Sequence, residues 1–161
     1  MGGASGIVAA SDIVIADDTA RFAFSEVRLG LVPGVIAPFV LQKMNPSKAR
    51  EWMLTGAFFS AAEALDAGLV HVSAGEEESE SLLAERINHL LKASPMAIRY
   101  CKELLQVAKP GSDIDQVLPV AAKFISLARS SEEGREGLRA FFEKRPPEWV
   151  PDAGNEYPAE S

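Results

Sequence analysis

The sequence has little of the residues that build cross-links and metal sites. Its single cysteine, Cys101, excludes an internal disulfide, and the helical pattern around it favours a thiol buried in the core. The two histidines, His71 and His89, lie far apart and have neither cysteine nor paired carboxylates beside them. The sequence therefore predicts no metal site.

Long apolar runs and concentrations of positive charge are also missing. There is no apolar stretch of membrane-spanning length and no charged-then-apolar leader, so we expect an intracellular, soluble chain outside any membrane. The net charge of −7 and the absence of a basic stripe argue against a nucleic-acid-binding surface. What is present, 161 residues of which 47% are hydrophobic, suits one globular domain with a real core.

The first half of the sequence predicts a few short strands among short helices. Strand-like runs occupy residues 13–16, where the strand is expected to be buried, 21–24 and 69–72. Short helices are expected over 39–44 and from Pro46 to Gly56, where the glycine ends the helix. Ser60 and Glu63 form a capping-box pattern for a helix that ends at Gly68.

From residue 76 the sequence predicts helices only. They span 76–93, 94 to about 108, and 112 or 113 to about 130 with a bend or break at Pro119; the last starts at Ser130 or Ser131. A proline-rich tail follows from Pro146. Two or three short strands cannot make a complete sheet, so we expect the chain to begin partway through a domain.

One stretch, residues 22–38, places a single carboxylate, Glu26, among apolar residues and follows it with two glycines and two prolines. Between Phe22 and Phe24 on one side and Leu29 and Leu31 on the other, the carboxylate is expected to be poorly solvated. Desolvation disfavours the charged form and brings a carboxyl group towards the range useful for acid/base catalysis. The alternative is a helix cap, or an exposed ion-pair partner of Arg28.

Five blocks of the sequence follow the order and spacing of a known family: Gly2–Ala16, Arg21–Pro33, Leu54–Gly56, Ser60–Val70 and Glu132–Arg145. Together they resemble the enoyl-CoA hydratase/isomerase family, also called the crotonase superfamily. The resemblance implies the C-terminal part of an α/β, crotonase-like (ClpP/crotonase) fold. Residues 1–75 would then hold part of the core with half of the active site, 76–145 a helical trimerisation region, and 146–161 an extended tail.

The resemblance also implies an acyl-CoA thioester substrate whose enolate is stabilised by two backbone N–H groups. Gly2 and Gly3 correspond to the family's glycine-rich turn; Gly3 is the matching N–H donor, and Gly2 is assigned to the substrate site. A preorganised donor of this kind is worth about 3–4 kcal/mol in the transition state. Glu26 matches the second of two glutamates that hydratases of the family use as acid and base.

The main departure from the family pattern is Gly6, which stands where the first of those glutamates would be. Glycine cannot transfer a proton, so the simplest chemistry is a single-base shuttle through Glu26 that moves a 3-double bond to the 2-position. The run Val35–Phe39 is similar to isomerase variants of this stretch. However, the same glycine occurs in hydratases that resemble methylglutaconyl-CoA hydratase. Hydratase and isomerase chemistry therefore both stay open.

Near the C-terminus, Lys144 matches a family position whose ammonium meets a CoA phosphate, often across a subunit boundary, and Phe141 matches one near the adenine or acyl pocket of the neighbouring subunit. The alternative is a basic helix end that favours the helix dipole. The resemblance further implies a homotrimer or hexamer (a dimer of trimers), with coenzyme A as part of the substrate and no metal or covalent cofactor. It implies a role in fatty-acid or branched-chain amino-acid degradation, in the cytoplasm, or in mitochondria if a leader is lost upstream.

Two further functions are compatible with the same residues. One is another reaction of the superfamily, thioester hydrolysis or decarboxylation, which reuses the oxyanion site. The other is a non-catalytic, truncated subunit that only oligomerises, which the loss of a carboxylate at Gly6 would favour.

Overall fold

The computed structural model describes residues 3–151. The chain forms two compact units, one ending at Leu83 and the other beginning at Ala84. The first unit contains α1 (Gly3–Ala10), β1 (Ile15–Asp17), β2 (Arg21–Ala23), the 3₁₀ helix η1 (Glu26–Leu29), α2 (Ala37–Lys43), α3 (Pro46–Thr55), β3 (Phe58–Ser60), α4 (Ala61–Asp66) and β4 (Val72–Ala74). The second contains the C-terminal half of α5 (Glu76–Leu91), whose first half belongs to the first unit, with α6 (Pro95–Val107), α7 (Ile114–Ser130) and α8 (Glu132–Glu143).

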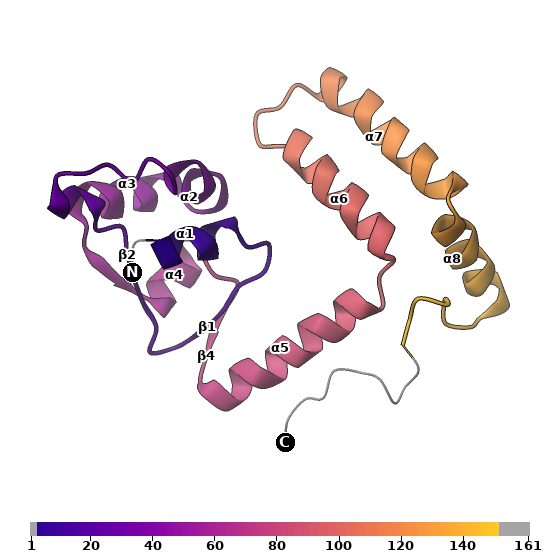
Figure 1. The fold of residues 1–161 in the computed structure, drawn as a ribbon, viewed down its shortest axis with the longest axis horizontal. Coiled ribbons are helices and arrows are strands. Elements are labelled where there is room, and N and C mark those ends of the chain that lie inside the picture. The colour runs from indigo at the N-terminus through magenta and orange to yellow at the C-terminus, as the bar shows by residue number, and fades with distance from the viewer. Residues whose placement is uncertain (1–2, 152–161) are drawn as a thin grey trace. The chain divides into compact units, whose positions relative to one another are not determined.

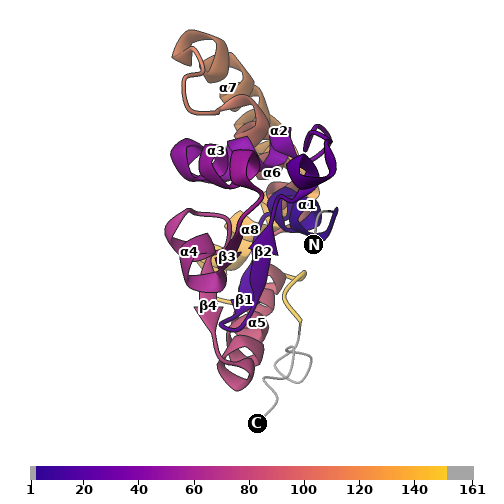
Figure 2. The ribbon, with the colours of Figure 1, turned by 90° about the vertical axis from the view of Figure 1, so that its left-hand side faces the viewer.

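The strands of the first unit form two separate pairs. β1 and β4 run parallel, with Ile15 opposite Val72, and β2 and β3 run antiparallel, with Phe22 opposite Phe59. Figure 2 shows β2 and β3 side by side next to α4. Pairs of three-residue strands are marginal on their own, so their stability depends on the side chains packed around them.

Those side chains are aromatic and centre on Phe59, which is 1% exposed. The rings of Trp52 and Phe59 stack at a centroid distance of 3.8 Å and an interplanar angle of 6°. Phe22 and Phe24 lie on the same ring at 5.6 and 5.4 Å. The core therefore ties β2, where Phe22 lies, to β3 and α3, and it sets where the chain leaves β2 towards Glu26.

Four of the helix ends predicted from the sequence are confirmed, whereas the helix expected over 39–44 begins at Ala37 and the one expected over 76–93 ends at Leu91. Gly56 ends α3 in the left-handed region at φ 61°, and Ser60 and Glu63 form both hydrogen bonds of the capping box. Ser94 caps α6 by accepting from the Ala97 N–H. Ser131 caps α8 by accepting from the Gly134 N–H.

Three predictions of secondary structure are wrong in detail. The first strand begins two residues later than expected and Ile13 is exposed, and the run 69–72 is loop until β4 begins at Val72. β3 was not predicted at all. The predicted break at Pro119 does not occur, since α7 continues through this residue from Ile114 to Ser130.

The second unit is helical within its described part, and α6 and α7 lie side by side as a helical hairpin (Figure 1). Tyr100 and Phe124 stack across the hairpin at 5.5 Å. The prediction of a buried thiol is wrong: Cys101 is exposed and lies on a shallow apolar groove of the hairpin. A helical period marks one apolar face but does not tell whether the chain itself covers that face.

Candidate active site

Glu26 begins η1, three residues after β2 ends. The short helix is closed by Gly30, whose backbone is left-handed at φ 74° and whose N–H bonds back to the carbonyls of Glu26 and Val27. The hydroxyl of Ser5 on α1, itself buried, donates to the carbonyl of Ala23 at 3.2 Å. The N-terminal half of α1 is thereby attached to the strand end that precedes Glu26.

The Oε2 atom of Glu26 is buried and has no hydrogen-bond partner. Among residues 3–151 it is the one buried side-chain nitrogen or oxygen in this condition. A buried carboxylate oxygen without a partner costs free energy, so native proteins retain few of them, commonly at sites of chemistry. Glu26 as a whole residue is half-buried.

The residues around Glu26 are not all arranged as the sequence suggests. Phe22 and Phe24 are buried, but Leu29 and Leu31 are exposed. Leu29, Leu31, Val32 and Val35 are between 61% and 85% exposed and form an apolar surface, called here the 29–35 surface. Of the apolar sequence neighbours expected around Glu26, the two before it are therefore buried and the two after it are exposed.

Arg28 lies over the end of α3. Its Nε donates to the carbonyl of Thr55 at 3.2 Å, and its side chain covers Gly56, where an added Cβ would lie 3.0 Å from it. Arg28 is exposed and bonded elsewhere, so the alternative of a Glu26–Arg28 ion pair is wrong.

Gly3 is the first residue of α1, and Gly2 lies outside the described residues. The first N–H groups of a helix have no intrahelical partner, and the backbone N–H of Gly3 is one of these. α1 is fixed at its other end by Lys43, whose ammonium donates to the carbonyls of Val8 and Ser11. Burial lowers the pKa of Lys43, against the opposite effect of Asp12. No sequence signal indicated this clamp.

Gly6 is buried where α1 crosses the start of α2. A Cβ at this position would collide with Cγ2 of Ile36 and lie 3.3 Å from its Cβ, and Ile36 is itself part of the core. The packing therefore admits no side chain at position 6 unless Ile36 moves or is replaced. The glycine that the sequence shows here suits this close packing, and a carboxylate side chain at position 6 would collide with Ile36 in the same way.

The two C-terminal candidates lie at the end of α8, in the second unit. Phe141 is 77% exposed, and its ring meets that of the equally exposed Phe142 edge-on at 5.7 Å. Lys144 is exposed and caps α8 in the left-handed conformation, with φ 56°. Glu26 and Lys144 thus belong to different units.

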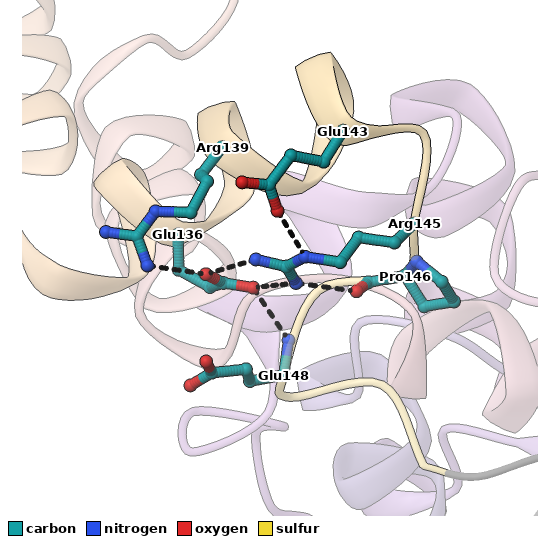
Figure 3. A network of polar contacts seen from close by, with 6 residues as sticks. All are labelled: Glu136, Arg139, Glu143, Arg145, Pro146 and Glu148. Carbon is teal, nitrogen blue, oxygen red and sulfur yellow. Dashed lines mark hydrogen bonds and ion pairs between the residues drawn. The ribbon is translucent and has the colours of Figure 1, made fainter.

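A polar network beside Lys144, shown in Figure 3, was not predicted. Both carboxylate oxygens of Glu136 accept from the guanidinium of Arg145, at 2.6 and 3.0 Å, and Oε1 also accepts from the Glu148 N–H at 3.1 Å. The Arg145 hydrogen bonds hold the pKa of Glu136 below its usual range, and Glu136 raises the pKa of Arg145. A glutamate and an arginine nine residues apart form no recognisable sequence pattern, so nothing in the sequence indicated this pair.

Metal-ligand clusters and membrane-spanning helices are both absent from the described residues. Residues 3–151 contain no cluster of three or more His, Cys, Asp or Glu that could hold a metal ion. In the same range no helix is long and apolar enough to cross a membrane.

Comparison with known proteins gives first a fold and then a family. A crystal structure of an enoyl-CoA hydratase from Shewanella pealeana matches with a TM-score of 0.85 at 40% identity, over 91% of this chain and 55% of the other. An enoyl-CoA hydratase/isomerase from Marinobacter aquaeolei matches with a TM-score of 0.87 at 36% identity, over 94% and 57%. The fold is therefore crotonase-like α/β, represented by part of that domain, as the sequence predicted.

The family model described as enoyl-CoA hydratase/isomerase matches residues 1–152. A Thermus thermophilus protein named as an enoyl-CoA hydratase is 34% identical over 149 residues, which cover 90% of this chain and 57% of that protein. The carnitinyl-CoA dehydratase of Proteus mirabilis is 30% identical over 155 residues, 92% of this chain and 58% of its own. The chain belongs to the enoyl-CoA hydratase/isomerase family, and it spans a little over half the length of these relatives.

Proposed function

We propose that the chain carries half of an acyl-CoA site in which Glu26 is the acid/base and the Gly3 N–H is one oxyanion donor. The observation that carries this proposal is the buried, unpartnered Oε2 of Glu26. A structural carboxylate would be expected to fill its acceptor sites, whereas an acid/base must keep one for the proton it transfers. Family membership supports a CoA thioester as the substrate.

In the reaction that we favour, the Glu26 carboxylate removes a proton from C2 of a 3-enoyl-CoA. The electrons move onto the thioester oxygen, and the Gly3 N–H donates to the resulting enolate. The proton then returns from Glu26 to C4 as the double bond forms between C2 and C3, so the product is the 2-enoyl isomer. The collision between any side chain at Gly6 and Ile36 supports one carboxylate over two.

Hydration remains a second candidate, because the relatives named above include hydratases and a dehydratase. There the Glu26 carboxylate would take a proton from the water whose oxygen adds at C3, and would then deliver that proton to C2 as the enolate collapses. Thioester hydrolysis or decarboxylation at the same oxyanion site stays a third possibility without a specific observation in its favour.

We propose that exposed residues bind the acyl chain and the coenzyme A portion of the substrate. The 29–35 surface is an apolar area next to Glu26 suited to an acyl chain or a covering segment. Lys144 is proposed to meet a CoA phosphate and Phe141 the adenine or acyl group. Gly2 stays a predicted substrate contact outside the described residues.

We further propose a homotrimer or a dimer of trimers built through the second unit. The apolar side chains of α6 to α8 are largely exposed, and the hairpin carries an apolar groove of about 520 Å³. Apolar surface of this extent suits association with another copy. A non-catalytic subunit would use the same surface, so oligomerisation alone does not separate the two functions. Location in the cytoplasm or in mitochondria stays a prediction.

The proposal is tested by offering the chain a 2-enoyl-CoA and a 3-enoyl-CoA separately and following the conjugated thioester absorbance. Appearance of the 2-enoyl signal from the 3-enoyl substrate indicates isomerisation, and loss of it from the 2-enoyl substrate indicates hydration. Glu26→Gln should lower the rate at least about a hundredfold. Glu51→Gln, at an exposed carboxylate on α3, is the matched control and should leave the rate unchanged.

Activity that survives Glu26→Gln contradicts the assignment of the base. No turnover of either substrate by a folded, oligomeric chain would instead support the non-catalytic subunit.

A further inference from the structure

The C-terminal end of α8 is built from an unfavourable residue. Lys144 is the one non-glycine residue with positive φ in the described range 3–151. A left-handed backbone brings the Cβ of an L-residue close to a carbonyl oxygen, and glycine avoids this. The chain uses glycine for the same purpose at Gly30, Gly56 and Gly68. Position 144 instead carries a lysine, although the left-handed backbone conformation there costs free energy for a residue with a Cβ.

The residues on both sides of Lys144, Glu143 and Arg145, are held in place by hydrogen bonds. Arg145 Nε donates to Glu143 Oε2 at 2.6 Å, and the other guanidinium nitrogens bind Glu136 on the same helix (Figure 3). The backbone N–H groups of Lys144 and Arg145 donate to the carbonyls of Phe141 and Ala140, at 3.3 and 3.0 Å. These contacts fix the backbone at Lys144 without using its side chain.

The segment that follows is fixed to the same helix. Glu148 donates its N–H to Glu136, and the Trp149 ring lies so close to Gly137 that a Cβ there would be 2.9 Å from the ring. Trp149 also donates from Nε1 to the carbonyl of Lys92 at 3.2 Å. The chain after Lys144 therefore cannot relax the strained residue by shifting.

The ammonium of Lys144 forms no ion pair with the described residues and faces solvent. It is exposed, and no carboxylate among residues 3–151 forms an ion pair with it, whereas Arg145 next to it is paired twice. A lysine that only favoured the helix dipole could stand anywhere in the last turn and would not need the left-handed position. The hydrogen bonds on both sides of Lys144 instead hold this one residue in the left-handed conformation.

We propose that Glu136 and Arg145 are positioning residues, which hold Lys144 in its left-handed conformation so that its ammonium meets a phosphate of the CoA thioester. The inference rests on the proposed function, since it takes its ligand from there. Neither residue touches the ligand; both act through Lys144.

The test uses four variants, with affinity for coenzyme A measured by calorimetric titration and stability by thermal denaturation. Lys144→Gly should raise or preserve the melting temperature, because glycine relieves the backbone, and weaken coenzyme A binding by about tenfold or more. Glu136→Gln and Arg145→Lys should weaken binding as well, since neither retains the bidentate pair. Arg139→Gln is the control, because Arg139 also lies 3.7 Å from Glu136 but precedes the residues that close the helix.

The decisive measurement is a double variant. If Glu136 acts only through Lys144, Glu136→Gln in the Lys144→Gly background should cost stability but no further affinity. Additive losses of affinity, an unchanged affinity in Lys144→Gly, or no coenzyme A binding by the unaltered chain would each overturn the inference. Turnover lost in Glu26→Gln with these affinities unchanged would leave the proposed function standing while the positioning role falls.

Discussion

The two units of the chain bury their apolar side chains to very different degrees. All fifteen residues of the hydrophobic core cluster lie between Ala9 and Val70, in the first unit. In the second unit the described buried apolar residues are Ala84, Val117 and Ala140, while large side chains such as Ile125 and Phe142 are exposed. The first unit is stabilised by its own hydrophobic core, whereas the second exposes apolar helix faces to solvent.

Two glutamates show the same difference in polar terms. Glu136 in the second unit is 8% exposed, and each of its carboxylate oxygens accepts at least one hydrogen bond. Glu26 in the first unit has a buried oxygen that accepts none. Buried polar groups in native proteins are nearly all hydrogen-bonded, as Glu136 is, so the unfilled acceptor of Glu26 is the exception that our proposal explains by acid/base chemistry. The comparison therefore separates a structural carboxylate from a candidate catalytic one without reference to sequence.

The largest expected effect tests where the packing energy lies. Trp52→Ala removes the ring stacked on Phe59 and should lower the free energy of unfolding of the first unit by about 3–5 kcal/mol. Phe142→Ala, at a ring 78% exposed, should change stability by no more than about 0.5 kcal/mol in the monomer. Denaturant titration followed by circular dichroism measures both. Equal losses would mean that the second unit has a core of its own.

The next effect concerns the close approach of α1 and α2. Gly6→Ala places a Cβ against Ile36 and should cost about 1–3 kcal/mol by overpacking. Gly34→Ala is the matched control in the same unit, since its Cβ would meet only Val32 at 3.8 Å. The Gly6→Ala cost should shrink when combined with Ile36→Ala, because the colliding Cγ2 is then absent. A neutral Gly6→Ala would remove the steric argument against a second carboxylate.

How much of this could be predicted depended on the range of the interactions. The ends of α3, α4, α6 and α8 follow from residues within one turn, such as Ser60 with Glu63, and these were predictable. β3 was not, because a three-residue strand is stabilised by pairing with β2, more than thirty residues earlier. The exposed position of Cys101 was missed for the related reason that tertiary structure decides which apolar face is covered.

The candidate site also combines features that the sequence predicted with features that only tertiary packing decides. Glu26 was identified from the sequence and the family pattern, but its expected apolar surroundings were not those observed, since Leu29 and Leu31 are exposed. Gly6 was recognised as a missing carboxylate, and only the packing against Ile36, thirty residues on, gives the physical reason. The pairing of Glu136 with Arg145 required the chain to turn back at Lys144, which no local pattern indicates.

A smaller effect compares helix caps in the two units. Ser60→Ala removes the capping hydroxyl of α4 and the hydrogen bond that it donates to Glu63 Oε2 at 2.9 Å, and it should cost the first unit about 1 kcal/mol. Ser94→Ala removes the cap of α6 and also a hydrogen bond to Glu133 at 2.5 Å, so the second unit should lose at least as much. Thermal denaturation of both variants gives the comparison. A larger loss for Ser60→Ala would show that the Ser94–Glu133 contact contributes nothing.

The smallest expected effect is a pH dependence specific to the second unit. Because Arg145 lowers the pKa of Glu136 in the folded chain, the stabilisation is complete well above the ordinary glutamate pKa of about 4.3 and is lost as the pH falls through the lowered value. Three groups face the Glu136 carboxylate: Arg139, Arg145 and the Glu148 N–H. Arg145 is also hydrogen-bonded to Glu143. The Arg145 side chain is 34% exposed, so solvent weakens the pair and keeps the effect small.

The fluorescence of Trp149 reports this part of the chain directly when Trp52→Phe removes the other indole. On acidification below about pH 4.3 the Trp149 signal should change in the parent and much less in Glu136→Gln, which has no proton to take up at that position. Asp17 and Glu63, whose pKa values are also lowered by hydrogen bonds from Thr19 and Ser60, lie in the first unit. An unchanged acid response in Glu136→Gln would locate the titrating group elsewhere and remove the Glu136–Arg145 pair from the account of how α8 ends.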